Sequence, residues 1–315
     1  MPALRRQWFA LAYVVVLAIG LTCPNLGSQG GTLRLEVLRP WCIAGIFLCA
    51  GLVLPGRRLA AAIGSWRAHL LIQSICFVLA PLAGLIVAWL AHLCGLPVSV
   101  QTGLIILGCL PTTISSCVVI TGLAGGDQGI ALVNSVLGNL LGLIITPLLI
   151  TLLIGHTCNS PIAGVIAQLT LLAVVPVLLG QLARWPLGDR LDRGRAQFGV
   201  ISGGLLLLVL LGIFSDLAGL GLASEVLPVA VLSLVLFAIL LVAAWALACR
   251  FVRRARIAIA ATASQKAIAL GIPLISLLFA NDPVLPMLLL PVIIYHIVQS
   301  LASSLLAGWT SARPA

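Results

Sequence analysis

Long apolar runs separated by short polar, glycine- or proline-containing stretches extend along the whole chain. A helix that crosses the hydrocarbon core of a bilayer needs about 20 residues of this kind. Ten such segments are predicted, and the polar stretches between them are interpreted as connections. The segments are expected at residues 8–24, 38–55, 69–93, 99–123, 128–155, 160–183, 197–219, 227–249, 256–280 and 284–308. The pattern therefore predicts an all-α polytopic membrane protein.

Composition supports this interpretation and excludes other classes. Of the 315 residues, 62% are hydrophobic and 8% are charged, whereas an average soluble protein has roughly 25% charged residues. The net charge of +10 comes from short basic clusters between apolar runs, which is typical of membrane topology rather than of nucleic-acid binding. The nine cysteines show no metal-ligand spacing, so we expect buried thiols rather than a metal site or disulfides. The expected surroundings are a lipid bilayer, with no nucleic-acid partner.

Arginine positions predict the orientation in the membrane. Fourteen of the sixteen arginines fall at the chain ends or in connections that follow even-numbered spans, and only Arg34 and Arg39 fall on the opposite side. Positive residues concentrate on the cytoplasmic side, so both termini are expected there. The apolar run after Arg6 is interpreted as a first span rather than a cleaved signal, because no small-residue cleavage site precedes Pro24.

The ten predicted spans divide at the polar connection 155–160 into two sets of five, residues 1–157 and 158–315. Because five is odd, two structurally related halves would insert with opposite topology, as in many secondary transporters. The fourth span of each half is the most polar of its set, with Pro111 in one and Pro273 in the other. Unwound backbone at membrane depth is tolerated where it is buried in protein or lines a cavity, so this pairing indicates a transport site. The alternative is a simple proline kink in each span.

These motifs resemble the bile acid:sodium symporter superfamily, solute carrier family 10, in particular the branch with its seventh human member and bacterial relatives. The resemblance covers nearly the whole chain and rests on residues 69–73, 108–118, 125–127, 134–147, 264–273 and 290–299. It implies two inverted five-helix repeats, with a panel domain of spans 1, 2, 6 and 7 and a core domain of spans 3–5 and 8–10. It further implies broken spans 4 and 9 that cross near the midplane, and alternating access in a bacterial inner membrane.

The resemblance also implies residues that bind Na⁺, the only cofactor considered. The cation-binding residues carried over are Ser116, Cys117, Ser135, Asn139 and Gln265. Two departures predict altered coupling: Ala261 stands where the bile-acid branch has a glutamate, and Cys117 where it has an asparagine. A hard cation needs several oxygen ligands, so the loss of a carboxylate and an amide weakens a complete two-sodium site.

Lys266 is the single lysine of the chain and lies within the ninth predicted span. A lysine at the centre of a span costs about 2.5–3.5 kcal/mol on insertion scales, which makes it functional by default. One hypothesis is that its ammonium replaces a cation, and another is that it binds an anionic substrate. The third is that the side chain reaches an interface and has no role.

Further polar residues in the spans are candidates to contact the substrate, or to line the place where Lys266 would replace a cation. They are Thr112, Thr113, Ser115, Ser264, Gln73 and His296. His296 is a proton or substrate ligand, or else a hydrogen-bonded structural histidine. Asp127 is predicted to cap the fifth span, and Asp216 to be an interfacial cap rather than a counter-ion to Lys266.

We therefore expect a secondary-active transporter, working by alternating access on a small organic anion with altered Na⁺ coupling. The alternative is a non-transporting membrane regulator of ion homeostasis that acts through a partner. An enzyme is not expected, because no span offers a nucleophile with a base, or paired carboxylates.

Overall fold

The computed structural model describes residues 12, 14–28, 30–53, 65–113, 115–155, 170–193, 195–218, 223–279 and 282–311. These residues form helices and no strand, as the apolar pattern predicts. Six helical segments within them are long and apolar enough to cross a membrane, so the polytopic helical class is confirmed. The count of ten spans stays a prediction. In the predicted first span, most residues before Val14 lie outside the described part of the structure. The connection 156–160 lies outside it as well.

The chain divides into two compact units. Unit 1 consists of Met1–Leu54, Ser160–Ala223 and Pro273–Pro286, and unit 2 of Pro55–Asn159, Ser224–Ile272 and Met287–Ala315. Both units therefore draw residues from both halves of the sequence.

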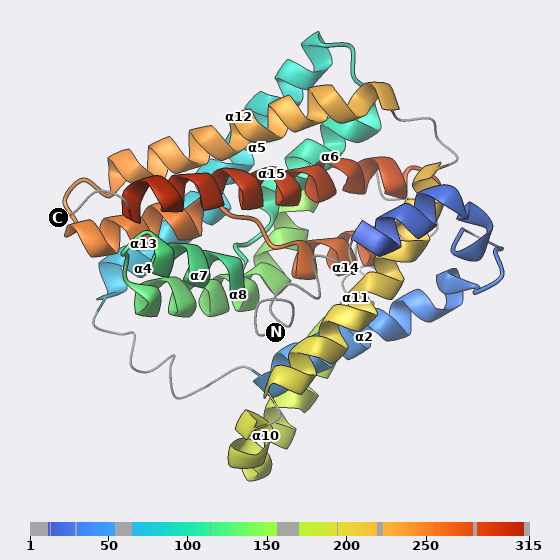
Figure 1. The fold of residues 1–315 in the computed structure, drawn as a ribbon, viewed down its shortest axis with the longest axis horizontal. Helices are drawn as coiled ribbons and strands as arrows, with labels where there is room; N and C mark the ends of the chain where they lie inside the picture. The colour runs from blue at the N-terminus through green and yellow to red at the C-terminus, as the bar shows by residue number, and fades with distance from the viewer. Residues whose placement is uncertain are drawn as a thin grey trace. The chain divides into compact units, whose positions relative to one another are not determined.

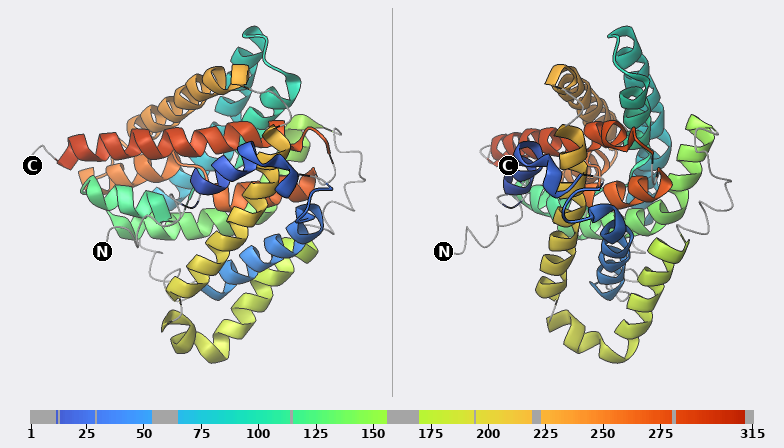
Figure 2. Two further views of the ribbon diagram at one scale, coloured as in Figure 1. Left: turned by 45° about the vertical axis from the view of Figure 1, so that its right-hand side comes forward. Right: turned by 90° about the vertical axis from the view of Figure 1, so that its right-hand side faces the viewer.

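Three long helices make up most of the described part of unit 1. Its elements are η1 (Pro24–Leu26), α2 (Leu35–Val53), η4 (Thr170–Val174), α10 (Val175–Arg193) and α11 (Arg195–Ala218). Helix α2 lies beside α10 and α11 (Figure 2). A Cβ on Gly51 would collide with the Val177 oxygen, and one on Gly180 would lie 2.7 Å from the Leu48 oxygen. Glycines thus allow the backbones of α2 and α10 to approach closely, as is common between helices in lipid.

Two of the expectations from the sequence bear on unit 1. The arginine-rich stretch 184–196, expected as a connection, is helical as far as Arg193, and α11 begins at Arg195. The stretch also contains Pro186 and Gly188, which disfavour helix, so helix propensity alone does not explain why α10 continues to Arg193. Asp216, expected as an interfacial cap, forms an ion pair with Arg39 of α2 at 3.5 Å.

Unit 2 begins with a continuous helical span and contains both interrupted segments. Its first elements are α4 (Trp66–Ser74), the π-helical η3 (Ile75–Leu79), α5 (Ala80–Leu93), α6 (Val98–Cys109), α7 (Ser115–Leu123) and α8 (Gln128–Ile154). Its later elements are α12 (Ala223–Leu247), α13 (Arg253–Ala263), the start of α14 (Ile268–Leu278) and α15 (Leu285–Ser311). Helices α5 and α6 run side by side (Figure 1), with Gly84 facing Gly108.

Asp127 caps α8, as the sequence predicts. Its Oδ1 accepts hydrogen bonds from the N–H groups of Gly129 at 2.9 Å and Ile130 at 3.2 Å. These bonds satisfy donors that the first turn of a helix leaves without partners. The cap fixes the start of α8, the helix that supports one of the two breaks.

Candidate functional site

The two interrupted segments of unit 2 contact each other through their main chains. Helix α6 ends at Cys109 and α7 begins at Ser115, while α13 ends at Ala263 and α14 begins at Ile268 (Figure 1). Both segments are therefore interrupted, as predicted, but the second break lies at residues 264–267, and Pro273 lies within α14. The N–H of Ala267 donates to the Pro111 oxygen at 2.8 Å, and Thr112 Oγ1 donates to the Thr262 oxygen at 2.6 Å. Each break thus supplies partners for backbone groups that the other leaves open.

Helix α8 supports the first break with side-chain donors. Thr146 Oγ1 donates to the Cys109 oxygen at 2.9 Å, and Asn139 Nδ2 donates to the Thr112 oxygen at 2.8 Å. A Cβ on Gly142 would lie 2.8 Å from Cγ of Pro111, so the missing side chain makes room for the proline ring. The unwound segment is therefore held in one arrangement by α8.

Lys266 extends from the second break to the end of α6. Its side chain is 2% exposed, and Nζ donates to the Gly108 oxygen at 2.8 Å and to the Leu110 oxygen at 2.7 Å. The last carbonyls of a helix lack intrahelical donors and carry the negative end of the helix dipole. The ammonium therefore occupies a place that favours a cation. Such burial does not fit a side chain that reaches the membrane surface.

Gln299 of α15 holds the main chain of Lys266. The N–H of Lys266 donates to Gln299 Oε1 at 2.7 Å, and Gln299 Nε2 donates back to the Lys266 oxygen at 3.0 Å. Gln299 Nε2 also lies 3.1 Å from Nδ1 of His296, which connects that predicted site residue to Lys266 through one side chain. Tyr295 adds a further bond from α15, with its hydroxyl donating to the Ser264 oxygen at 2.7 Å.

The five residues expected to bind cations lie in linked contacts. Ser116 Oγ donates to Gln265 Oε1 at 2.7 Å, and Cys117 Sγ lies 2.8 Å from Ser135 Oγ. Asn139 Nδ2 donates to the Ser135 main-chain oxygen at 2.7 Å. The structure thus brings these side chains together, with several of their oxygens bonded to protein donors. Their role as cation ligands stays a prediction.

The remaining expected site residues fall around the same breaks. Thr113 Oγ1 accepts a bond from Ser116 at 3.2 Å, so Thr113 and Ser116 lie together at the start of α7. Gln73 of α4 bonds to α8 and not to the breaks themselves: its Nε2 lies 3.2 Å from both the main-chain oxygen and Oδ1 of Asn134. Ser115 begins α7, but its side chain lies outside the described part of the structure.

Several supporting residues are absent from the sequence-based set. Gln299 and Tyr295 bond to the second break, and Asn134 Nδ2 lies 2.7 Å from Nδ1 of His69. A polar side chain within an apolar span is costly unless it has a partner, and this signal alone could have indicated Gln299 and Asn134. Their partners could not be read from the sequence, because they belong to other helices.

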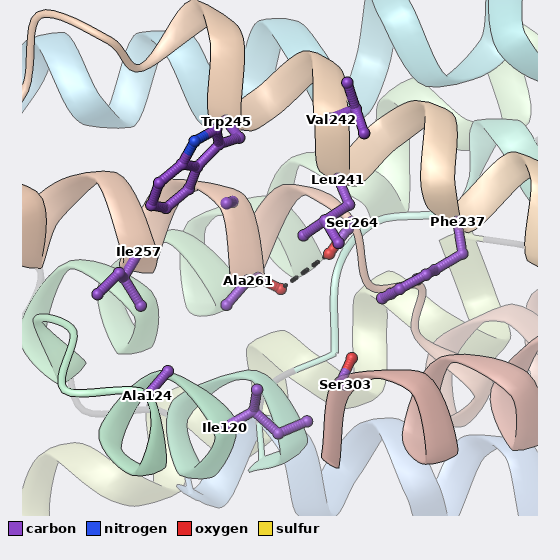
Figure 3. Close-up of a pocket in the computed structure, with 11 residues that line it drawn as sticks. Ile120, Ala124, Phe237, Leu241, Val242, Trp245, Ile257, Ala261, Ser264 and Ser303 are labelled. Atoms are coloured by element: carbon purple, nitrogen blue, oxygen red, sulfur yellow. Dashed lines mark hydrogen bonds between the residues drawn. The ribbon is translucent and has the colours of Figure 1, made fainter. Parts of the chain in front are cut away.

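An apolar cavity of about 340 Å³ lies beside the second break, within unit 2. Figure 3 shows side chains of α7, α12 and α13 around it, with Ser303 of α15 on one side. Ala261 lines this cavity together with Ser264. Ala261, which stands where the resemblance implies a glutamate, therefore lies in an apolar environment.

Broken helices joined by backbone hydrogen bonds, inside a polytopic helical chain, define a membrane transporter of the discontinuous-helix class. Residues 7–312 match the model of the SBF-like CPA transporter family, and the chain belongs to that family, within the bile acid:sodium symporter superfamily. It is therefore a transporter of the bile acid:sodium symporter type.

Relatives from animals and bacteria match almost end to end. The chain is 31% identical to sodium/bile acid cotransporter 7 of Mus musculus, over 96% of this chain and 92% of the relative. It is 29% identical to the protein of the same name from Danio rerio, over 98% and 96%. An uncharacterized protein of Pseudomonas aeruginosa is 32% identical over 95% and 91%.

Proposed function

We propose that the protein carries an organic anion across the membrane by alternating access, with the Lys266 ammonium in place of one coupling cation. The observation that carries the proposal is the pair of bonds from Lys266 Nζ to the oxygens of Gly108 and Leu110. In transporters with discontinuous helices, coupling cations are coordinated by unwound carbonyls and half-helix C-termini. A covalently attached ammonium provides the same positive charge to the same kind of oxygen.

The geometry favours cation replacement over direct substrate binding by Lys266. Nζ is bonded to main-chain oxygens and the side chain is 2% exposed, which leaves it poorly placed to meet an incoming anion. The departures at Ala261 and Cys117 support the same conclusion, because they remove the carboxylate and amide that the resemblance associates with Na⁺. A cysteine sulfur is a soft ligand and suits a hard cation poorly.

The proposal leaves one Na⁺ site, formed by Ser135, Asn139 and nearby main-chain oxygens. The anionic substrate would be favoured by the positive ends of the half-helices that start at Ser115 and Ile268. The names of the animal relatives associate those proteins with sodium and bile acid, so a bile acid is the first probe.

Alternating access would come from movement of a core against a panel. The grouping of the residues into two units, each drawn from both chain halves, supports this division. The arginine distribution supports cytoplasmic termini, and a place in a bacterial inner membrane belongs to the same proposal. Inverted repeats and ten spans belong to the same proposal.

The test is uptake into liposomes that contain the purified protein, measured with a labelled bile acid and a panel of other organic anions. An imposed Na⁺ gradient is compared with choline, and the membrane potential is set independently with K⁺ and valinomycin. With one Na⁺ per monovalent anion, no net charge moves, so uptake should depend on Na⁺ and not on potential.

Two results would contradict this scheme. Uptake accelerated by a negative interior would mean that a second cation moves, so that Lys266 does not replace it. Absence of uptake across the whole panel, with correctly inserted protein, would favour the non-transporting regulator.

A further inference from the structure

The apolar cavity beside α12 is not used by the proposed transport chemistry. We name it the α7–α12 cavity, lined by side chains that include Ile120, Ala124, Trp245 and Ile257. Its volume of about 340 Å³ is at the lower end of the range for small-molecule pockets, roughly 300–1,000 Å³. Figure 3 shows these side chains converging on one space from α7, α12 and α13. The lining favours a hydrocarbon occupant.

One side of the cavity opens toward the surface of a membrane-spanning helix. Val242 and Trp245, both in the lining, are 66% and 42% exposed on α12. Apolar side chains exposed on a span face lipid acyl chains. A chain from the surrounding bilayer can therefore enter the cavity without crossing water.

The end of α12 next to the cavity is strongly basic. The Arg256 guanidinium lies 4.1 Å from the centre of the Trp245 ring, and its Nε donates to the Trp245 oxygen at 2.9 Å. Arg250, Arg253 and Arg254 lie in or beside the turn between α12 and α13. In the part of the chain that the structure describes, none of these arginines has an ion pair with a carboxylate. Positive charge and an apolar cavity thus lie together at one end of α12.

We propose that the α7–α12 cavity holds one acyl chain of an anionic phospholipid whose phosphate lies at the arginines of the α12–α13 turn. The apolar lining selects the chain, and the uncompensated arginines select the negative headgroup. Basic clusters at the ends of spans attract anionic lipids in this way. A neutral hydrophobic solute would leave the arginines without a counter-charge, and a free inorganic anion would leave the cavity unfilled.

The test measures lipid retention by native mass spectrometry on the full chain in detergent, with phosphatidylglycerol or phosphatidylcholine of identical acyl chains. Ala124→Phe fills the cavity, and Leu123→Phe is its matched control, because Leu123 is 59% exposed and not part of the lining. The wild type should prefer phosphatidylglycerol, and Ala124→Phe should weaken its retention by about tenfold, whereas Leu123→Phe should match the wild type.

A charge variant tests the headgroup separately. Arg256→Gln should reduce the preference for phosphatidylglycerol by about fivefold, the effect expected of one basic residue near a lipid surface. Arg34→Gln is its control, since Arg34 is exposed, belongs to unit 1 and is part of neither the cavity lining nor the α12–α13 turn. Equal retention of both lipids by the wild type would overturn the proposal, as would unchanged retention in Ala124→Phe.

A measurement on the unmodified chain keeps the proposal testable if Ala124→Phe does not fold. Phosphatidylglycerol with a photoreactive diazirine in one acyl chain is added to the wild-type protein and activated by light. Peptides from α7, α12 or α13 should carry the label. Labelling restricted to other helices would overturn the proposal.

Discussion

Replacing Lys266 tests whether its ammonium stands in for a cation. Loss of the side chain leaves the Gly108 and Leu110 oxygens without the bonds they receive at 2.8 and 2.7 Å. A buried polar group without a partner costs about 1–3 kcal/mol, so the pair costs about 2–6 kcal/mol. Relief of the buried charge, which costs several kcal/mol per ion, acts in the opposite direction. The net change in the free energy of unfolding therefore does not tell whether the Lys266 ammonium replaces a cation.

Comparison of two substitutions removes this ambiguity. Lys266→Ala and Lys266→Met both remove the charge, but alanine leaves space beside the two oxygens, whereas methionine fills it. If the space suits a cation, Na⁺ should stabilise the alanine variant more than the methionine variant. A ligand at 100 times its Kd stabilises a protein by about 2.7 kcal/mol. At roughly 2 °C per kcal/mol for a chain of this size, the Tm should rise by about 5 °C.

The assay is thermal unfolding of the purified variants in detergent, with NaCl replaced stepwise by choline chloride at constant ionic strength. The expected result is a saturable Na⁺-dependent rise in Tm that is larger in Lys266→Ala than in Lys266→Met or the wild type. Equal responses of the two variants, or an equal effect of choline, would refute the idea that Lys266 occupies a cation position. Loss of anion-dependent stabilisation without a change in the Na⁺ response would indicate a substrate role instead.

Three further predictions concern the residues around the breaks. Ser135→Ala should abolish any Na⁺-dependent rise in Tm of the wild-type background, and an unchanged Na⁺ titration would exclude Ser135 from the cation site. Gln299→Leu should lower the free energy of unfolding by about 2–6 kcal/mol, because it leaves a buried N–H and a buried C=O unpaired; a loss below about 1 kcal/mol in thermal unfolding would contradict this. Gly142→Ala should cost about 1–3 kcal/mol by crowding Pro111, 2.8 Å from the new Cβ. Gly204→Ala, with nothing within 4 Å, should be close to neutral in the same measurement.

The sequence predicts the helical membrane class and the interruptions because both follow from local rules. A bilayer requires apolar helices, so composition alone indicates the class. Pro111 cannot donate a backbone hydrogen bond, and Thr112 and Thr113 beside it offer side-chain partners, so a break in this span is readable from neighbouring residues. The helix cap by Asp127 likewise depends only on neighbouring residues, Gly129 and Ile130. The helix α10 continues to Arg193 through Pro186 and Gly188, which disfavour helix, so its extent is not readable from local propensity.

The contacts of Lys266 could not be predicted, because they join residues far apart in the chain. Gly108 and Leu110 precede Lys266 by 158 and 156 residues, and no periodicity links them. Spacing predicts that a lysine lies within a span but not which carbonyls its ammonium reaches. The same holds for Gln299, whose bonds to Lys266 span 33 residues and two helices. Side-chain direction in a broken helix depends on packing against the other segment, and no local sequence pattern reveals that packing.

The breaks and the lysine are better understood together than separately. Pro111 ends the hydrogen-bond ladder of α6 and leaves carbonyls that need donors, while the second break provides Lys266 Nζ and the Ala267 N–H. A diffusible cation in this place would leave whenever its concentration fell, and the crossing would lose partners for buried oxygens. A covalently held ammonium cannot leave, so the crossing keeps its bonds whether or not ions are bound. In the proposed scheme, the cost of burying the chain's single lysine is offset by a crossing that keeps these bonds without a bound ion at this position.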